Sequence, residues 1–236
     1  MEDKSWWFKH RNKLILAGIE KFKPRNSRII EVGAGNGNTT KFLVHNGFQT
    51  AMFEPGNLGC INAKRRGMEN IVCGLFGGDT VKSNCVESIG IFDVLEHIKD
   101  DRRFLEGFGE QLEAGGLLYI TVPAHKWLWS DSDDCGHFRR YNLGTLYEVV
   151  AASGYEVLYS TYFCWLLLPV IWLFRRLPYV LRNKTKTKTI KRYGFVISIF
   201  ADKIVNRMLA GELRCVSNGN RCLFGASIFM VARKKL

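Results

Sequence analysis

The chain has 236 residues, enough for one sizeable domain, and 47% of them are hydrophobic, which excludes a disordered chain. Its 34 basic residues exceed its 22 acidic ones, and the net charge of +12 favours anionic partners: nucleic acid, phosphorylated molecules or an anionic membrane surface. Seven cysteines without C-x-x-C spacing argue against a disulfide framework or zinc cluster, and an acidic N-terminus argues against a signal peptide. We therefore expect a cytoplasmic protein.

Hydrophobic periodicity predicts helices and strands that alternate along the chain. A helix over 5–22 is expected within an N-terminal cap, 1–27. Helices are then expected over 38–47, 57–66, 99–113 and 142–153. Strands are expected over 28–32, 48–53, 70–73, 86–92, 117–122, 155–163 and 222–233. This order predicts a single α/β domain over 1–236, with a mostly parallel sheet and a helical, basic insertion at 164–221.

A glycine-rich turn follows the first predicted strand. It reads E-x-G-x-G-x-G and contains Glu31, Gly33, Ala34, Gly35 and Gly37. Glycines at the end of a strand let the backbone approach a ligand, and the next helix offers free N–H groups to an anion. A dinucleotide-binding turn needs its third glycine at position 38, which is Asn38, so a dehydrogenase is disfavoured.

The second predicted strand ends in Glu54 and Pro55. An acid at this place can accept hydrogen bonds from both hydroxyls of a ribose. Taken alone, Glu54 would more often be an ordinary surface acid. Combined with the glycine turn, it predicts a ligand that contains a nucleoside.

The fourth predicted strand ends in the sequence F-D-V-L-E-H, residues 92–97. Together with the glycine turn, this segment resembles class I S-adenosylmethionine (SAM) methyltransferases, in the group that includes ubiquinone-pathway O-methyltransferases. The resemblance covers about 28–160 and the terminal strand. It implies a Rossmann-like sandwich of seven strands with the last one antiparallel, SAM as the cofactor and S-adenosylhomocysteine (SAH) as its product.

The same resemblance implies the cofactor contacts. Phe92 would lie beside the methionine part of SAM. Relatives usually carry an acid after the third strand to hold adenine. This chain has Cys73 there, so the contacts with adenine would come from the backbone of Gly74 and Leu75. The expected cofactor-binding residues are Glu31, Gly33, Ala34, Gly35, Gly37, Glu54, Pro55, Gly74, Leu75, Phe92 and Asp93.

A metal is a weaker hypothesis. In the ubiquinone enzymes an acid-x-x-Glu-His set has been linked to a divalent metal, and the matching residues are Asp93, Glu96 and His97. Because SAM is already activated, the chemistry needs no metal. We expect none, with Glu96 and His97 bracing the loop.

Residues 123–141 are placed to meet the methyl acceptor, since ligands of open α/β sheets lie beyond the carboxyl ends of the strands. The patterns P-A-x-x-x-L-W-S and G-H-x-R-R-Y resemble a subgroup associated with surface-glycan and lipid modification. His137 is the first candidate for a general base and His125 the second. Alternatively, His137 and the arginines hold the loop to nearby acids. The expected acceptor-binding residues are Trp7, Trp127, Trp129, Arg139, Arg140 and Tyr141.

The insertion begins with an apolar run, 163–174, that is too short to span a bilayer, and a basic run follows at 182–192. Together the apolar run and the basic run predict either peripheral contact with the inner face of a membrane or a lid helix with a solvated loop.

The favoured function is therefore SAM-dependent methyl transfer to oxygen or nitrogen of a small-molecule acceptor or one linked to a lipid or glycan. An RNA methyltransferase is an alternative suggested by the basic charge. No Asn/Asp-Pro-Pro-aromatic motif follows the fourth strand and no Pro-Cys pair exists, so a nucleic acid partner is disfavoured. The third hypothesis is a non-catalytic, membrane-associated SAM-binding protein.

Overall fold

The computed structural model describes residues 5–23, 25–165, 167–181 and 199–235. Its seven-stranded sheet has the order β3-β2-β1-β4-β5-β7-β6. The strands are β1 Arg28–Val32, β2 Gln49–Phe53, β3 Ile71–Val72, β4 Val86–Phe92, β5 Leu112–Pro123, β6 Tyr155–Phe163 and β7 Ser227–Lys234. Strands β1 to β5 pair in parallel, and β7 lies antiparallel between β5 and β6. The predicted fold class is confirmed.

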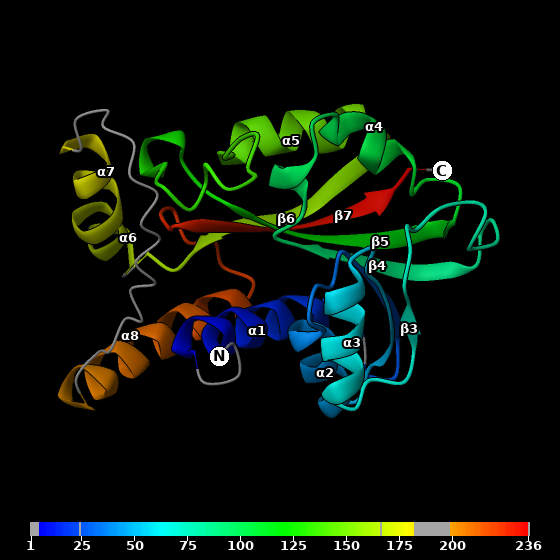
Figure 1. The fold of residues 1–236 in the computed structure, drawn as a ribbon, viewed down its shortest axis with the longest axis horizontal. Helices are drawn as coiled ribbons and strands as arrows, with labels where there is room; N and C mark the ends of the chain where they lie inside the picture. Colours follow the sequence, from blue (N-terminus) through cyan, green and yellow to red (C-terminus); the bar gives the residue numbers. More distant parts are fainter. Residues whose placement is uncertain (1–4, 24, 166, 182–198, 236) are drawn as a thin grey trace.

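Helices cover both faces of the sheet (Figure 1). One layer contains α1 Trp6–Glu20, α2 Asn38–His45, α3 Asn57–Arg65 and α8 Ile199–Ser217, and the other contains α4 Asp101–Glu106 and α5 Leu143–Ala152. Beyond the carboxyl ends of the parallel strands lie α6 Leu167–Ile171, the π-helical turn η4 Trp172–Arg176 and α7 Leu177–Leu181. Two 3-10 turns, η2 Leu95–His97 and η3 Lys126–Leu128, follow β4 and β5.

Successive side chains of a strand point to opposite faces of the sheet, so the apolar residues of the central strands require helices on both faces. In β7, Met230 belongs to the apolar cluster under α4 and α5, while its neighbour Phe229 belongs to the cluster under α1 and α8. Helix α1 lies close to the sheet because it carries Gly18: a Cβ there would be 2.2 Å from the Phe229 ring. This close packing fixes the helix whose polar residues reach the candidate site.

The predicted helix over 99–113 was wrong in its second half. Helix α4 ends at Glu106, and Leu112 already pairs with Val86 as part of β5. Phe104, Leu105, Phe108 and Leu112 follow helical spacing, but the chain turns at the glycines between them, and the last two apolar positions contact the core from a turn and a strand.

The seventh strand also begins later than predicted, at Ser227 rather than residue 222. Leu223 and Phe224 are exposed, 76% and 68%, and Gly225 approaches the backbone of Phe163 so closely that a Cβ would lie 2.2 Å from its oxygen. The apolar residues before β7 are therefore on the surface at the carboxyl edge of the sheet.

The described part of the insertion at 164–221 is helical, as predicted. The basic run 182–192 lies outside the described residues. Among the residues that the structure does describe, no helix has both the length and the apolar character that crossing a membrane requires.

Candidate functional site

The glycine turn after β1 adopts a conformation that favours glycine. Gly33, Gly35 and Gly37 have φ angles of 72°, 55° and 71°. A Cβ at Gly33 would lie 2.7 Å from Val94, and one at Gly37 would lie 3.0 Å from Ala63. At Gly35, by contrast, no atom of the described residues apart from its chain neighbours lies within 4 Å of such a Cβ. The turn is tight on its inner sides and open at Gly35, where a ligand can approach the backbone.

Glu54 is held beside this open face. Its two carboxylate oxygens each accept a backbone N–H, from Gly35 and from Gly56, at 2.7 Å. The Glu54 carbonyl accepts from the N–H of Gly74 at 3.1 Å, which ties the loop after β3 to the same place. Leu75, next in that loop, is 75% exposed. Because a carboxylate has about four acceptor positions, Glu54 retains capacity for two hydroxyl donors.

Asp93 closes the site from the end of β4. Its φ angle is 58°, and its N–H donates to the Thr121 carbonyl at 2.9 Å. One carboxylate oxygen accepts from the Thr121 hydroxyl at 3.0 Å, and the other lies 2.6 Å from Nε of Arg11 in an ion pair. The Arg11 guanidinium also lies 6.0 Å from the centre of the Phe92 ring. Helix α1 therefore contributes a buried cation to the carboxyl end of the sheet.

The structure thus brings the expected cofactor set together at the carboxyl ends of β1 to β4 (Figure 1). Their individual contacts with a cofactor stay predictions. The set comprises Glu31, Gly33, Ala34, Gly35, Gly37, Glu54, Pro55, Gly74, Leu75, Phe92 and Asp93.

Glu31 is buried beneath the turn and accepts a hydrogen bond of 2.5 Å from the Thr40 hydroxyl. Burial raises its pKa from 4.5 to about 7, against the opposing effects of Thr40 and Arg11. Between these two values the folded protein holds a proton that the unfolded chain releases. The free energy of unfolding therefore falls as the pH rises through this window.

We expect Glu31→Gln to remove this pH dependence. Between pH 5 and 8 the wild type should lose about 2.5 kcal/mol more stability than the variant, as urea unfolding at both pH values would show. Glu87→Gln is the control. Burial tends to raise the pKa of Glu87, but its contacts with Lys23 and Arg28 outweigh burial and lower that pKa below the window in which Glu31 titrates. If the free energy of unfolding of Glu31→Gln fell with pH as steeply as that of the wild type, the pH dependence could not be assigned to Glu31.

Asp133 organises the loop after β5. It is fully buried and accepts from Arg140 at 2.6 and 3.1 Å, from Nδ1 of His137 at 2.8 Å, and from the Ser130 N–H and hydroxyl at 2.8 and 2.9 Å. Although burial opposes it, the hydrogen bonds from His137 and Arg140 hold the pKa of Asp133 well below its usual range. The carboxylate anchors both candidate residues, as the alternative interpretation of this loop described.

His137 lies against η2. Its ring meets the His97 ring edge to face, with centroids 4.5 Å apart. Possible ligand atoms of Glu96, His97 and His137 lie within 4.8 Å of one another. The structure therefore groups Glu96 and His97 with His137 rather than with Asp93, whose carboxylate pairs with Arg11.

Glu96 itself is buried, and one of its oxygens has no hydrogen-bond partner among the described residues. Burial and the nearby charge of Asp93 raise its pKa well above the usual value. Its carboxyl therefore holds a proton to a higher pH than an exposed glutamate does.

A groove of about 910 Å³ lies beside this loop. It is lined by five of the predicted catalytic and acceptor residues and by residues from η3, α5, η4 and α7: His125, Lys126, Trp127, Trp129, Phe138, Arg140, Tyr141, Asn142, Thr145, Arg176 and Tyr179. His125 stacks on Trp127 and on Tyr162, with centroids 5.4 and 5.0 Å apart. Burial lowers the pKa of His125, so its ring is neutral near pH 7.

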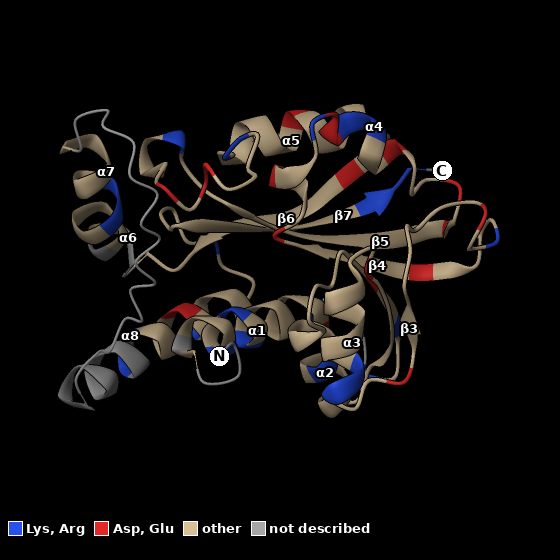
Figure 2. Ribbon diagram, viewed as in Figure 1, with Lys and Arg blue, Asp and Glu red and all other residues tan. Residues whose placement is uncertain are grey.

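The first part of the insertion forms one wall of the groove. Arg176 donates to the Trp129 carbonyl at 3.0 Å, and Arg175 donates to the Ser132 hydroxyl. Asp134 accepts from the Trp129 indole at 2.7 Å and from the Tyr179 hydroxyl at 3.4 Å. Figure 2 shows basic residues in blue between α6 and α7. These bonds hold η4 and α7 against the loop after β5, so that the two elements cover one side of the groove.

Three of the predicted catalytic and acceptor residues do not line the groove: Trp7, His137 and Arg139. Trp7 stacks on Phe163 at 6.2 Å between centroids and packs against the apolar cluster under α1 and α8. Arg139 forms an ion pair of 2.6 Å with Asp101, which also accepts from the Tyr141 hydroxyl at 2.8 Å. Acceptor binding by Trp7 and Arg139 stays a prediction.

Sequence reasoning missed Arg11, Arg176 and Tyr179. The sequence did contain a signal for Arg11. It precedes Leu14 by three positions and Ile15 by four, which places a basic residue on the apolar face of the helix. Arg176 and Tyr179 reach the groove through a fold of the insertion that periodicity does not predict.

A family model for the methyltransferase domain matches residues 7–160, more than half of the chain. No curated protein matches the chain.

Solved structures of SAM-dependent methyltransferases have a similar fold. One from Mesorhizobium loti is 13% identical with a TM-score of 0.58, over 99% of this chain and all of that one. One from Archaeoglobus fulgidus is 17% identical with a TM-score of 0.56, over 98% of this chain and all of that one. Phosphoethanolamine N-methyltransferase 2 of Haemonchus contortus, solved with SAM, is 18% identical with a TM-score of 0.55, over 94% of this chain and 52% of that one.

Proposed function

We propose that this chain, which belongs to the methyltransferase-domain family whose model it matches, methylates an oxygen or nitrogen of an anionic acceptor linked to a lipid or glycan. SAM is its methyl donor. The observation that carries the acceptor class is the groove, whose lining combines three cationic side chains with three aromatic rings: Lys126, Arg140, Arg176, Trp127, Trp129 and Tyr179.

In this proposal SAM lies over the open face of the glycine turn. The ribose hydroxyls donate to the remaining acceptor positions of Glu54, and the adenine lies near Gly74 and Leu75. The methionine part lies toward Phe92 and Asp93. Because the sulfonium is already a good leaving group, the protein must align the acceptor in line with the methyl group and remove a proton.

His137 is the proposed base. With Nδ1–H donating to Asp133 at 2.8 Å, its Nε2 carries the free lone pair, and the buried carboxylate fixes both the tautomer and the ring orientation. His125, whose ring is neutral near pH 7, is the second candidate. Both belong to the segment that follows β5, at the carboxyl edge where the cofactor is proposed to bind.

The groove suits a phosphate or carboxylate next to a ring. Arg176 donates one bond to the Trp129 carbonyl, and a guanidinium has five N–H donors, so it can also bind an anion. Trp127 is 49% exposed and offers a flat apolar face to a sugar or similar ring.

Exposed apolar side chains beside the groove support a lipid-linked acceptor. Trp172, Leu173 and Phe174 of η4 are 46%, 48% and 58% exposed. Leu223 and Phe224 come just before Ser227, which pairs with the ends of β5 and β6 at the same edge of the sheet. Exposed apolar side chains next to a basic groove suit the interface of an anionic membrane.

Labelled SAM tests the proposal. Incubated with phosphate-bearing lipid-linked glycans, the protein should transfer the label, and removal of the phosphate from the acceptor should abolish transfer. Arg176→Ala should raise the acceptor KM about tenfold, the cost of about one charged hydrogen bond, with SAM affinity unchanged. Arg233→Ala, an exposed arginine paired with Glu156, is the control.

SAM binding without transfer to any anionic acceptor would instead favour the non-catalytic interpretation. Equal acceptor KM values in Arg176→Ala and Arg233→Ala would remove the groove from the acceptor site.

A further inference from the structure

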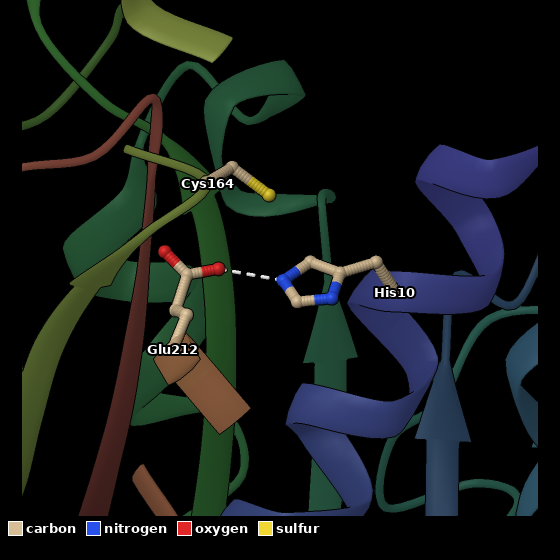
Figure 3. A group of neighbouring side chains, drawn as sticks. All are labelled: His10, Cys164 and Glu212. Carbon is tan, nitrogen blue, oxygen red and sulfur yellow. Dashed lines mark hydrogen bonds and ion pairs between the residues drawn. The ribbon is translucent and has the colours of Figure 1, made fainter. Parts of the chain in front are cut away.

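Three buried side chains from distant parts of the chain meet at the carboxyl edge of the sheet. His10 comes from α1, Cys164 directly follows β6 and Glu212 comes from α8. Their side chains are almost inaccessible, with relative exposures of 4%, 0% and 2%. In Figure 3 the His10 ring and the Glu212 carboxylate face each other, and the Cys164 thiol points toward the same space.

One nitrogen, one sulfur and one carboxylate oxygen of this cluster all lie within 4.8 Å of one another. An imidazole, a thiolate and a carboxylate are all ligands of Zn²⁺ and related divalent ions, and three protein ligands leave a position for water. We propose that His10, Cys164 and Glu212 form a binding site for a divalent metal ion of the zinc class.

The spacing requires only a small adjustment. In the structure Nε2 of His10 lies 2.6 Å from a Glu212 oxygen, as a direct hydrogen bond. Bond lengths of about 2.0–2.3 Å to a tetrahedral Zn²⁺ place ligand atoms about 3.3–3.6 Å apart. The imidazole and the carboxylate therefore separate by less than about 1 Å when the ion enters between them.

Two local features aim the ligands. The second oxygen of Glu212 accepts the N–H of Trp165 at 3.2 Å, which fixes the carboxylate plane as outer hydrogen bonds do in metal sites. Cys164 has a φ angle of 60°, a conformation that is costly for a residue with a side chain. The position of its thiol is therefore imposed by the surrounding fold.

Charge also favours an ion at this place. A divalent ion that binds Cys164 displaces the thiol proton to solvent and binds the thiolate. Thiolate and carboxylate then balance the charge of the ion, which removes the cost of a buried unpaired charge.

The ion would join α1, the end of β6 and α8 into one unit. Arg11, next to His10, pairs with Asp93 and lies over Phe92. The site would thereby fix the helix that supplies the buried cation of the cofactor site. This role is independent of the identity of the methyl acceptor.

Cobalt(II) tests the proposal directly, because a thiolate bound to Co²⁺ gives an intense charge-transfer absorption band. The metal-free full-length protein, titrated with Co²⁺, should develop the band with one equivalent, and Zn²⁺ should displace it. Cys164→Ser should abolish the band. Cys215→Ser, on α8 outside the cluster, should keep it.

A second readout covers the case in which Cys164→Ser does not fold. Zn²⁺ should raise the melting temperature of the wild type and leave that of His10→Gln and Glu212→Gln unchanged, since an ion stabilises the fold only where it binds. No band in the wild type, or a band that persists in Cys164→Ser, would overturn the site and leave the cluster as core packing. Equal stabilisation of the wild type and both variants by Zn²⁺ would overturn it as well.

Discussion

Replacing Gly35 with leucine is expected to abolish SAM binding while the fold still forms. A Cβ at Gly35 would have no described residue within 4 Å apart from its chain neighbours, so a leucine there would extend from open space into the region proposed for the cofactor. The N–H that Gly35 donates to Glu54 remains in the variant, which leaves the carboxylate in place. Calorimetric titration should show the affinity for SAM reduced by at least about a hundredfold, because the leucine blocks the backbone approach.

Gly115→Leu is the matched control. Gly115 also has a positive φ angle, 72°, and open space around its Cβ position, but it lies near the opposite end of β5. Both variants carry the same backbone strain of about 1–2 kcal/mol and should melt at similarly lowered temperatures. Unchanged SAM affinity in Gly35→Leu would refute the cofactor site, whatever the melting temperatures.

Asp133→Asn is expected to destabilise the protein strongly and to stop methyl transfer. The substitution keeps the shape but removes the charge that Arg140 and His137 share in a buried place. Breaking one partner of a buried ion pair costs about 3–5 kcal/mol. With the loop after β5 released, the base and the groove lose their positions, while the cofactor turn on β1 is untouched. Chemical denaturation, SAM calorimetry and labelled transfer measure the three effects separately.

The neighbouring Asp134→Asn is the control for this experiment. Asp134 accepts the Trp129 indole N–H on an exposed part of the same loop, and its loss should cost less than about 1 kcal/mol. Because the folded pKa of Asp133 lies below its usual range, its stabilisation is present at neutral pH and lost as the pH falls through that pKa. The stability gap between wild type and Asp133→Asn should therefore narrow in acid. Equal losses in both variants at pH 7 would contradict the anchoring role.

The sheet could be predicted because each strand has a local signature. Short apolar runs close to a glycine or proline define β1, β2 and β6 without knowledge of their neighbours. The cofactor turn was equally accessible, since its chemistry requires glycines at fixed spacing within seven consecutive residues. The helix over 99–113 failed because helical spacing in Phe104, Leu105, Phe108 and Leu112 arises from a short helix, a turn and a strand that share one core.

The rest of the site depends on tertiary packing. His137 was identified from its motif, but its bond to Asp133 is a property of the folded loop. Arg11 reaches Asp93 only because α1 packs closely over the sheet at Gly18. His10 and Glu212 are separated by 202 positions, and no local pattern links residues so far apart.

A crystal structure with SAH bound tests the central claim most directly. The account predicts the ribose hydroxyls within hydrogen-bond distance of Glu54, the homocysteine part over Gly33 to Gly37, and the sulfur facing the space between Asp93 and the loop 123–141. SAH bound away from the glycine turn, or with no contact to Glu54, would contradict it.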